Sequence, residues 1–370
     1  MKVLIVDDSA LFRRVISECL SSLPDVDVVG TASTGRAALQ KVKDLEPDLM
    51  TLDMEMPGMS GLEMLDALKR EGLPVNVVLV SALTSHGGAL TLQALAKGAF
   101  DYIVKPEGLG SVENRNELRN ELMLRVRALA PKLEVRKILR GSNPRGLRQM
   151  SCRSESAVEP LYAAPEAHVP EVTDCSKPQL VLIGVSTGGP NALHRLFSTL
   201  PTDLGVPILV VQHMPPLFTR TLAESLSGNT RHIVREALEG ECLAPNCVYI
   251  APGGKQMRLM RGPNGTKTVR ITDDAPENNC KPCVDYLFRS VATEFPGEAL
   301  AVILTGMGND GSGGLRLLKR GGCQVLAQDE STCVVFGMPK AAIDSGLVDA
   351  VLPIDEIGPR VARIVRGVAL

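Results

Sequence analysis

The sequence predicts two α/β domains, each a doubly wound, mostly parallel sheet, joined by a flexible linker. The chain has 370 residues, a length at which two domains are expected. Short β-branched runs alternate with amphipathic helical patterns in both halves. Between the halves lies a stretch with several prolines and little hydrophobic periodicity. We therefore expect domains at residues 1–125 and 179–370, with a linker at residues 126–178.

The composition restricts the class of protein. Hydrophobic residues make up 44% of the chain and charged residues 22%, as in ordinary globular proteins. The formal net charge of −2 gives no electrostatic reason to expect nucleic acid, and the absence of tryptophan argues against base stacking. No apolar run approaches the roughly 20 residues of a membrane span. We expect a cytoplasmic monomer with no nucleic-acid partner and no direct membrane insertion.

The first domain is predicted to contain five parallel strands with helices between them. Helical periodicity appears at residues 11–20 and 36–45, and a last helix is expected to end near Leu129. The strands are expected at residues 2–6, 26–30, 49–52, 77–80 and 102–104.

Polar residues follow four of these strands directly. Asp7 and Asp8 follow the first, Asp53 the third, Ser81 the fourth and Lys105 the fifth. Carboxyl ends of parallel strands meet at one edge of a sheet. Three carboxylates there would repel one another unless a hard cation such as Mg²⁺ joined them, and the lysine and hydroxyl would complete a phosphoryl site on Asp53. Helix caps and a surface charge explain each residue singly, but not all five at matching positions.

The linker is predicted from composition alone. Residues 132–153 are strongly basic, and prolines follow at positions 160, 165, 170 and 178. An extended tether is the favoured interpretation. A basic docking segment for an acidic partner is the alternative.

The second domain repeats the strand–helix alternation. Helices are expected at residues 192–200 and 284–295, and residues 247–273 predict antiparallel hairpins inserted at an edge. Parallel strands are expected at residues 181–183, 208–211 and 300–304, and near Val325 and Val348.

Residues 184–188 of this domain fit the pattern G-x-S-x-G around Ser186. Such a sharp strand-to-helix turn exposes a serine hydroxyl beside backbone N–H groups that can hold an oxyanion. On this stretch alone, a serine that only caps the helix is an equal alternative.

His213 and Asp310 also follow predicted strands, which favours the nucleophile. His213 has the position of a general base, and Asp310 could orient its imidazole. The four other histidines lack this placement: His86 in the first domain, His168 in the linker, His194 within a helix, and His232.

Residues 306–311 offer a competing interpretation, because they fit G-x-G-x-x-G, with Asp329 ending the next strand. A dinucleotide site or another binding role for this domain therefore stays open. Three observations weigh against it: the pattern occurs late in the domain, Asp310 places an anion where a pyrophosphate would approach, and Ser186 and His213 would have no role.

The first third of the chain resembles the receiver domains of two-component systems, which are flavodoxin-like. Residues 53–61 match the family pattern D-x-x-M-P-x-x-x-G. The resemblance implies that Asp53 accepts a phosphoryl group and that Ser81, Lys105 and Tyr102 form the switch. It also implies Mg²⁺ held by Asp7, Asp8, Asp53 and the Glu55 carbonyl.

The second domain resembles the CheB family of chemotaxis methylesterases, through residues 183–190, 210–216, 249–254 and 305–311. The resemblance implies a Rossmann-like catalytic domain without a cofactor of its own. Ser186 would be the nucleophile, His213 the base, Asp310 the orienting acid and Met307 an oxyanion donor. The chain order serine–histidine–aspartate differs from that of α/β-hydrolases.

The two resemblances together imply a phosphorylation-activated enzyme that demethylates glutamate methyl esters and deamidates glutamines. Its substrates would be methyl-accepting chemoreceptors, and a chemotaxis histidine kinase would supply the phosphoryl group. The chain departs from the family at Cys280-Lys-Pro-Cys283, where Arg-Pro-Ser is usual. A redox dithiol and two incidental thiols both remain open for this pair.

Overall fold

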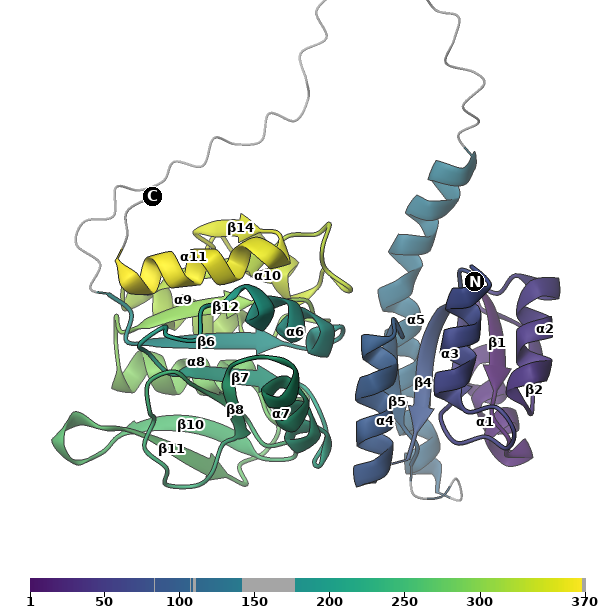
Figure 1. Cartoon of the computed structure of the whole chain (residues 1–370), viewed down its shortest axis with the longest axis horizontal. Coiled ribbons are helices and arrows are strands. Elements are labelled where there is room, and N and C mark those ends of the chain that lie inside the picture. Colours follow the sequence, from purple (N-terminus) through teal and green to yellow (C-terminus); the bar gives the residue numbers. More distant parts are fainter. Residues whose placement is uncertain (83, 107, 109–110, 142–176, 368–370) are drawn as a thin grey trace, which may run out of the picture.

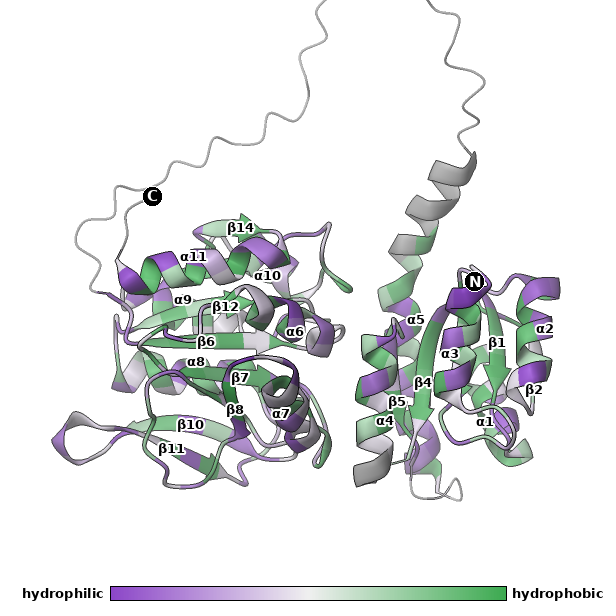
Figure 2. Cartoon of the chain, in the orientation of Figure 1, coloured by the Kyte–Doolittle hydropathy of each residue, from purple (hydrophilic) through white to green (hydrophobic). Residues whose placement is uncertain are grey.

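The structure, a computed structural model, describes residues 1–82, 84–106, 108, 111–141 and 177–367. Two α/β units follow one another along the chain, as predicted (Figure 1). In both units the strands are largely apolar and the helices combine an apolar and a polar side, which places each sheet between helical layers (Figure 2). Among the described residues, no helix combines the length and apolar character that crossing a membrane requires.

The first unit is a five-stranded parallel sheet in the order β2-β1-β3-β4-β5. This is a doubly wound arrangement, with α1 and α5 packed together and α2, α3 and α4 packed in sequence. The strands are β1 (Lys2–Val6), β2 (Asp27–Ala32), β3 (Leu49–Asp53), β4 (Asn76–Ser81) and β5 (Asp101–Val104). The helices are α1 (Ala10–Ser21), α2 (Gly35–Leu45), α3 (Gly61–Arg70), α4 (Ser85–Ala96) and α5 (Val112–Gly141).

Helix α5 is longer than predicted, because it continues past Leu129 to Gly141. Residues 132–140 consist mainly of lysine, arginine, leucine and glutamate, which are good helix formers. Their basic charge suggested a linker, yet their backbone is helical. The remainder of the predicted linker, at residues 142–176, lies outside the described residues.

The second unit is a seven-stranded parallel sheet in the order β14-β13-β12-β6-β7-β9-β8. Its strands are β6 (Leu180–Val185), β7 (Ile208–Gln212), β8 (Ile233–Glu236), β9 (Cys247–Ile250), β12 (Ala299–Ile303), β13 (Gln324–Gln328) and β14 (Ala350–Leu352). Its helices are α6 (Gly189–Thr199), α7 (Phe218–Asn229), α8 (Val284–Glu294), α9 (Ser312–Arg320), α10 (Met338–Asp344) and α11 (Ile354–Arg366).

An antiparallel hairpin is inserted in this unit, formed by β10 (Gln256–Arg261) and β11 (Lys267–Thr272). The prediction for residues 247–273 was wrong at its start, because β9 is a parallel strand between β7 and β8. All four residues of β9 are buried, and a continuous buried run is typical of a parallel strand covered on both faces. Strand β8 was not predicted.

The two units contact each other through helix α4 and strand β5 of the first. Helix α4 packs against α7 and α6, and Figure 1 shows it on the side that faces the second unit. This contact places the start of β5 and the end of α4 near the beginning of α6.

Candidate functional site

The predicted acidic cluster forms at the carboxyl edge of the first sheet. Asp7 and Asp53 are buried, whereas Asp8 is exposed. Carboxylate oxygens of the three residues lie within 4.8 Å of one another. A cavity of about 260 Å³ opens beside them, lined by Asp8, Asp53, Met54, Glu55, Ala82 and Lys105.

Lys105 forms ion pairs with two carboxylates of this cluster. Its Nζ lies 2.7 Å from Asp53 Oδ2 and 2.9 Å from Asp7 Oδ2. Burial raises the pKa of Asp53 above its ordinary value, and the lysine offsets this only partly. Burial alone would lower the pKa of Lys105, but the two carboxylates outweigh it and raise the pKa. The ammonium group therefore stays charged beside Asp53.

Of the other predicted switch residues, Ser81 lies at the same edge and Tyr102 lies farther back in β5. Ser81 is buried, and its hydroxyl donates to the Gly87 carbonyl at 3.4 Å. The backbone N–H of Glu55 donates to Asp53 Oδ1 at 3.3 Å. The ring of Tyr102 is buried and stacks on Phe218 of the second unit, with centroids 5.1 Å apart. The structure thus brings Ser81 and Glu55 to the edge that carries Asp53, whereas Tyr102, which pairs with Leu79 within the sheet, lies at the contact between the units.

The donor set of this edge suits a hard divalent cation. Three carboxylates converge within the span of one coordination sphere, and carboxylate oxygens are the ligands that Mg²⁺ prefers. Asp7 and Asp53 both form ion pairs with the ammonium group of Lys105, while Asp8 contributes an exposed carboxylate to the cavity. Asp7, Asp8 and Asp53 can therefore hold Mg²⁺.

Ser186 lies directly after β6, at the turn into α6. Its N–H donates to the Thr305 carbonyl at 3.0 Å, and its carbonyl accepts from Gln212 Nε2 at 2.9 Å. Gly188 has a φ of 77°, a conformation that glycine adopts without strain, and Pro190 occupies the first turn of α6. The β6–α6 turn is thus held by residues that end β7 and follow β12.

Gly306 allows a close approach to Ser186. A Cβ at position 306 would lie 2.8 Å from Ser186 Cβ, closer than real Cβ contacts come. The Gly306 carbonyl accepts from the N–H groups of Gly337 and Met338, which fixes the loop. Met307 follows Gly306, and its own N–H donates to no protein acceptor among the described residues. That N–H is therefore available to a ligand beside Ser186.

His213 follows β7 and pairs with Asp310. Its ring Nε2 lies 2.8 Å from Asp310 Oδ2, and its backbone N–H donates to the Val185 carbonyl. Burial alone would lower the pKa of His213, but the hydrogen bonds with Asp310 and Cys280 raise it to about 9. Ser186 Oγ is not hydrogen-bonded to the imidazole among the described residues. The His213–Asp310 pair and Ser186 lie at neighbouring strand ends, but the serine hydroxyl and the imidazole do not form a hydrogen bond in this structure.

Asp310 is buried among hydrogen-bond donors. Its carboxylate accepts from the backbone N–H groups of Val284, Asp285 and Gly311 at 2.7, 3.0 and 2.9 Å. Burial alone would raise the pKa of Asp310, but His213 and these N–H groups hold it well below its usual range. Val284 and Asp285 open α8, so the helix N-terminus stabilises the anion.

The two cysteines that depart from the family pattern both contact this pair. Cys280 Sγ lies 3.7 Å from His213 Nδ1, the ring nitrogen that Asp310 leaves free. Cys283 Sγ donates to Asp310 Oδ1 at 3.1 Å, and burial raises the pKa of the Cys283 thiol. Cys283 therefore acts as a neutral donor here.

Sequence reasoning missed several residues that hold the site. Gln212 and Thr305 brace the Ser186 turn, and Asn278 donates to Asp310 at 3.2 Å. The first two are polar residues at strand ends, a signal that was present in the sequence. Asn278 and Cys283 had no such signal, because their proximity to Asp310 depends on the tertiary packing that places the start of α8 beside it.

The remaining histidines have other environments. His232 is buried with its Nε2 3.0 Å from the Leu200 carbonyl, and His194 Nε2 lies 3.4 Å from Ser225 Oγ. His86 lies in α4, and His168 lies outside the described residues. The competing G-x-G-x-x-G loop does join β12 to α9, but its Asp310 is committed to His213.

The two sites are connected through the contact between the units. Thr187, which follows Ser186, donates to Asp101 Oδ2 at 3.2 Å. Asn191 of α6 donates to the Leu95 carbonyl of α4 at 2.7 Å. With the Tyr102–Phe218 stack, these contacts place the first unit against the turn that carries Ser186.

Two family models match the chain. The model described as CheB methylesterase matches residues 181–361, and that described as response regulator receiver domain matches residues 3–116. With the two parallel sheets, these matches define a response regulator whose second domain is enzymatic.

Similar proteins extend over the whole chain. A protein-glutamate methylesterase/protein-glutamine glutaminase from Desulfotalea psychrophila is 43% identical over 371 residues, with 99% of both chains covered. One from a Nocardioides species is 43% identical and covers 98% of this chain and 95% of its own. One from Bacillus subtilis is 40% identical and covers 99% of both chains. The chain therefore belongs to the CheB methylesterase family.

Proposed function

We propose that the protein hydrolyses glutamate methyl esters and glutamine amides on chemoreceptors, under control of phosphorylation at Asp53. The observation that carries the proposal is the 2.8 Å contact of His213 with the buried Asp310, next to the strand end that presents Ser186. The names of the similar proteins supply the reaction, and the receiver match supplies the control.

In the proposed reaction, Ser186 Oγ attacks the γ-carbonyl carbon of the ester or amide. Asp310 holds Nε2–H of His213, so Nδ1 accepts the serine proton. The Met307 N–H faces the developing oxyanion. Protonated His213 then gives its proton to the leaving oxygen or nitrogen, which departs as methanol or ammonia. Water, deprotonated by His213, attacks the acyl-enzyme, and His213 returns that proton to Ser186 Oγ as glutamate is left on the receptor.

Control is proposed to begin at Asp53. Asp7, Asp8 and the Glu55 carbonyl would hold Mg²⁺ with Asp53, and this cation would neutralise charge on the incoming phosphoryl group. Lys105 and Ser81 would then contact the phosphoryl oxygens. Because Asp101 begins β5 and Lys105 directly follows it, a shift of this strand would loosen the Asp101 contact to Thr187 and with it the cover over Ser186.

The proposed organisation is a receiver from residue 1 that includes the whole of helix α5 to Gly141, a linker that ends at residue 178, and a catalytic domain at residues 179–370. A chemotaxis histidine kinase would donate the phosphoryl group, and the protein would act as a cytoplasmic monomer.

Methanol release from methylated chemoreceptor tests the proposal directly. Full-length protein is incubated with methylated receptor, with and without Mg²⁺ and a small-molecule phosphodonor. We expect the phosphodonor to increase release, and Ser186→Ala to lower it by several orders of magnitude.

A matched control is Ser198→Ala, since Ser198 lies on the same helix and bonds only the Arg195 carbonyl. This variant should release methanol at the wild-type rate. Near-normal release by Ser186→Ala would show that the proposed nucleophile is wrong.

A further inference from the structure

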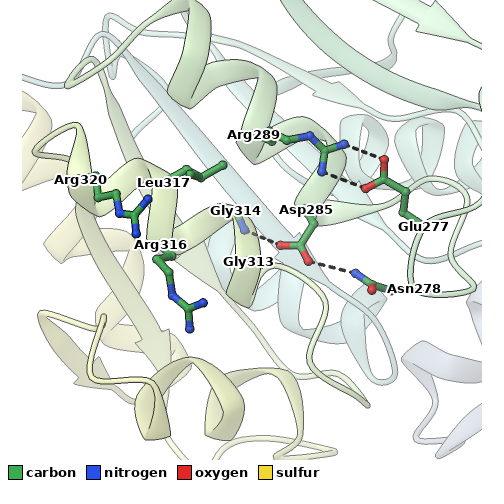
Figure 3. Close-up of a pocket in the computed structure, with 9 residues that line it drawn as sticks. All are labelled: Glu277, Asn278, Asp285, Arg289, Gly313, Gly314, Arg316, Leu317 and Arg320. Atoms are coloured by element: carbon green, nitrogen blue, oxygen red, sulfur yellow. Dashed lines mark hydrogen bonds and ion pairs between the residues drawn. The ribbon is translucent and has the colours of Figure 1, made fainter.

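A second cavity of about 500 Å³ lies between α8 and α9 (Figure 3). It is larger than the cavity at Asp53 and belongs to neither the nucleophile nor the phosphoryl site. Its lining is mostly polar and consists of Glu277, Asn278, Asp285, Arg289, Gly313, Gly314, Arg316, Leu317 and Arg320.

Two arginines of this cavity have no carboxylate partner in the part of the chain that the structure describes. Arg316 and Arg320 are exposed, lie one turn apart on α9 and extend from the same side of the helix (Figure 3). Neither makes an ion pair within 4.0 Å to any described residue. Arg289, by contrast, forms a double hydrogen bond with Glu277 at 2.6 and 3.0 Å. Two guanidinium groups are therefore available to an anion.

The carboxylates of the cavity are already satisfied. Glu277 is held by Arg289, and Asp285 accepts from the Gly314 N–H at 2.6 Å and from Asn278 Nδ2 at 3.0 Å. Neither is left to neutralise Arg316 or Arg320. The lining holds three arginines against two carboxylates, so it has an excess of positive charge, and the guanidinium groups offer it in a planar, multi-donor form that matches carboxylates.

One residue joins this cavity to the proposed active site. Asn278 Nδ2 donates both to Asp285 in the cavity wall and to Asp310, which orients His213. The cavity also begins at Gly313 and Gly314, directly after the loop that carries Met307 and Asp310. The cavity wall and the proposed active site therefore share one hydrogen-bonding residue and one loop.

We infer that Arg316 and Arg320 bind an acidic side chain of the substrate segment, near the glutamyl group that reacts. This inference rests on the proposed function. The reacting ester or amide is neutral and requires no cation, so the arginines would recognise a neighbouring residue. A free carboxylate close to the target is the substrate feature that their charge complements.

Two synthetic peptides test this inference on the full-length protein, in the presence of phosphodonor and Mg²⁺. Both carry one glutamyl methyl ester; one has glutamates within two helical turns of it, and the other has glutamines instead. Wild-type protein should prefer the acidic peptide in kcat/KM by about five- to tenfold, mainly through KM. In the double variant Arg316→Gln/Arg320→Gln, this preference should fall to about 1, and 0.5 M salt should weaken it in the wild type.

The matched control is Arg231→Gln, because Arg231 is exposed and also lacks a described carboxylate partner. It should keep the wild-type preference. Equal hydrolysis of both peptides by wild-type protein, or an equal loss on both in the double variant, would overturn the inference.

Binding separates this inference from the proposed function. The full-length Ser186→Ala protein is titrated with fluorescently labelled versions of the two peptides, and anisotropy reports affinity without catalysis. Tighter binding of the acidic peptide that is lost in Arg316→Gln/Arg320→Gln supports the cavity even if no peptide is hydrolysed. Equal affinity for both peptides overturns it even if hydrolysis is observed.

Discussion

The Thr187 hydroxyl donates a hydrogen bond to the Asp101 carboxylate, across the contact between the two domains. Thr187 follows the proposed nucleophile, and Asp101 opens β5, the strand after which Lys105 reaches Asp53. Asp101 Oδ2 also lies 3.0 Å from Arg125 Nε on α5. Burial raises the pKa of Asp101, and the arginine counteracts this. One strand therefore contacts both the phosphoryl site and the Ser186 turn.

Weakening the contact between the domains should raise the resting activity. Asn191→Ala removes the hydrogen bond to the Leu95 carbonyl, worth about 1 kcal/mol, and so should increase methanol release without phosphodonor by up to about fivefold. The stimulated rate should change less, so the ratio of the two rates falls. Gln40→Ala, on an exposed face of α2, serves as the control. An unchanged or lower resting rate in Asn191→Ala would contradict the gating model.

Magnesium binding should depend strongly on Asp8. The ammonium group of Lys105 forms ion pairs with Asp7 and Asp53. Asp8 is the one carboxylate of the cluster that does not contact this ammonium group. Asp8→Asn should weaken Mg²⁺ binding about tenfold or more, measured by calorimetry on the full-length protein. Asp25→Asn changes an exposed carboxylate elsewhere and should bind Mg²⁺ as the wild type does. Equal affinities in the two variants would argue against the predicted ligand set.

Cys280 should shift the pH dependence of catalysis. With a His213 pKa of about 9, most of the imidazole is protonated at pH 7 and cannot accept the serine proton. We therefore expect kcat/KM to rise with pH towards a midpoint near 9. Because Cys280 is one cause of the raised pKa, Cys280→Ala should move the midpoint to lower pH and increase kcat/KM at neutral pH.

The control for this profile is Cys242→Ala, which removes an exposed thiol from the segment before β9. Its profile should match the wild type. An identical midpoint in Cys280→Ala would show that the thiol does not influence the base.

The close approach at Gly306 should be needed for catalysis. In Gly306→Ala the new Cβ would lie 2.5 Å from Met338 Sδ, which a flexible side chain can relieve, and 2.8 Å from Ser186 Cβ, which would displace the serine or its turn. Because small misplacements of a reacting group are costly, we expect kcat to fall about tenfold or more while the thermal midpoint changes little. Gly228→Ala in α7 adds a Cβ into open space and should retain activity. Wild-type kcat in Gly306→Ala would show that the loop adjusts freely.

Much of the fold could be predicted because parallel strands have a strong sequence signature. The buried runs of β1, β3, β4, β6, β7 and β12 were found, and their order along the chain implies doubly wound sheets. The errors have physical causes. Strand β9 is only four residues long and precedes a true hairpin, and the end of α5 is basic although its residues are good helix formers.

The candidate site was predictable where chemistry follows strand ends. Asp7, Asp53 and Lys105 meet because carboxyl ends of parallel strands share an edge, and the same rule brought His213 to Asp310. Contacts made by loops were not predictable. Cys280 and Asn278 approach His213 and Asp310 from the segment before α8, whose position depends on the packing of the hairpin and helices.

Because α4 packs against α6 and α7, one surface of the receiver contacts the catalytic domain and is the same surface that a competing protein would bind. The face that carries Tyr102 is covered by Phe218 while the domains are together. A protein that binds this face must therefore compete with the catalytic domain, and its binding would draw the population towards the separated form. Such a competitor would release the Ser186 turn by mass action, at a concentration set by its affinity, without a phosphoryl group on Asp53.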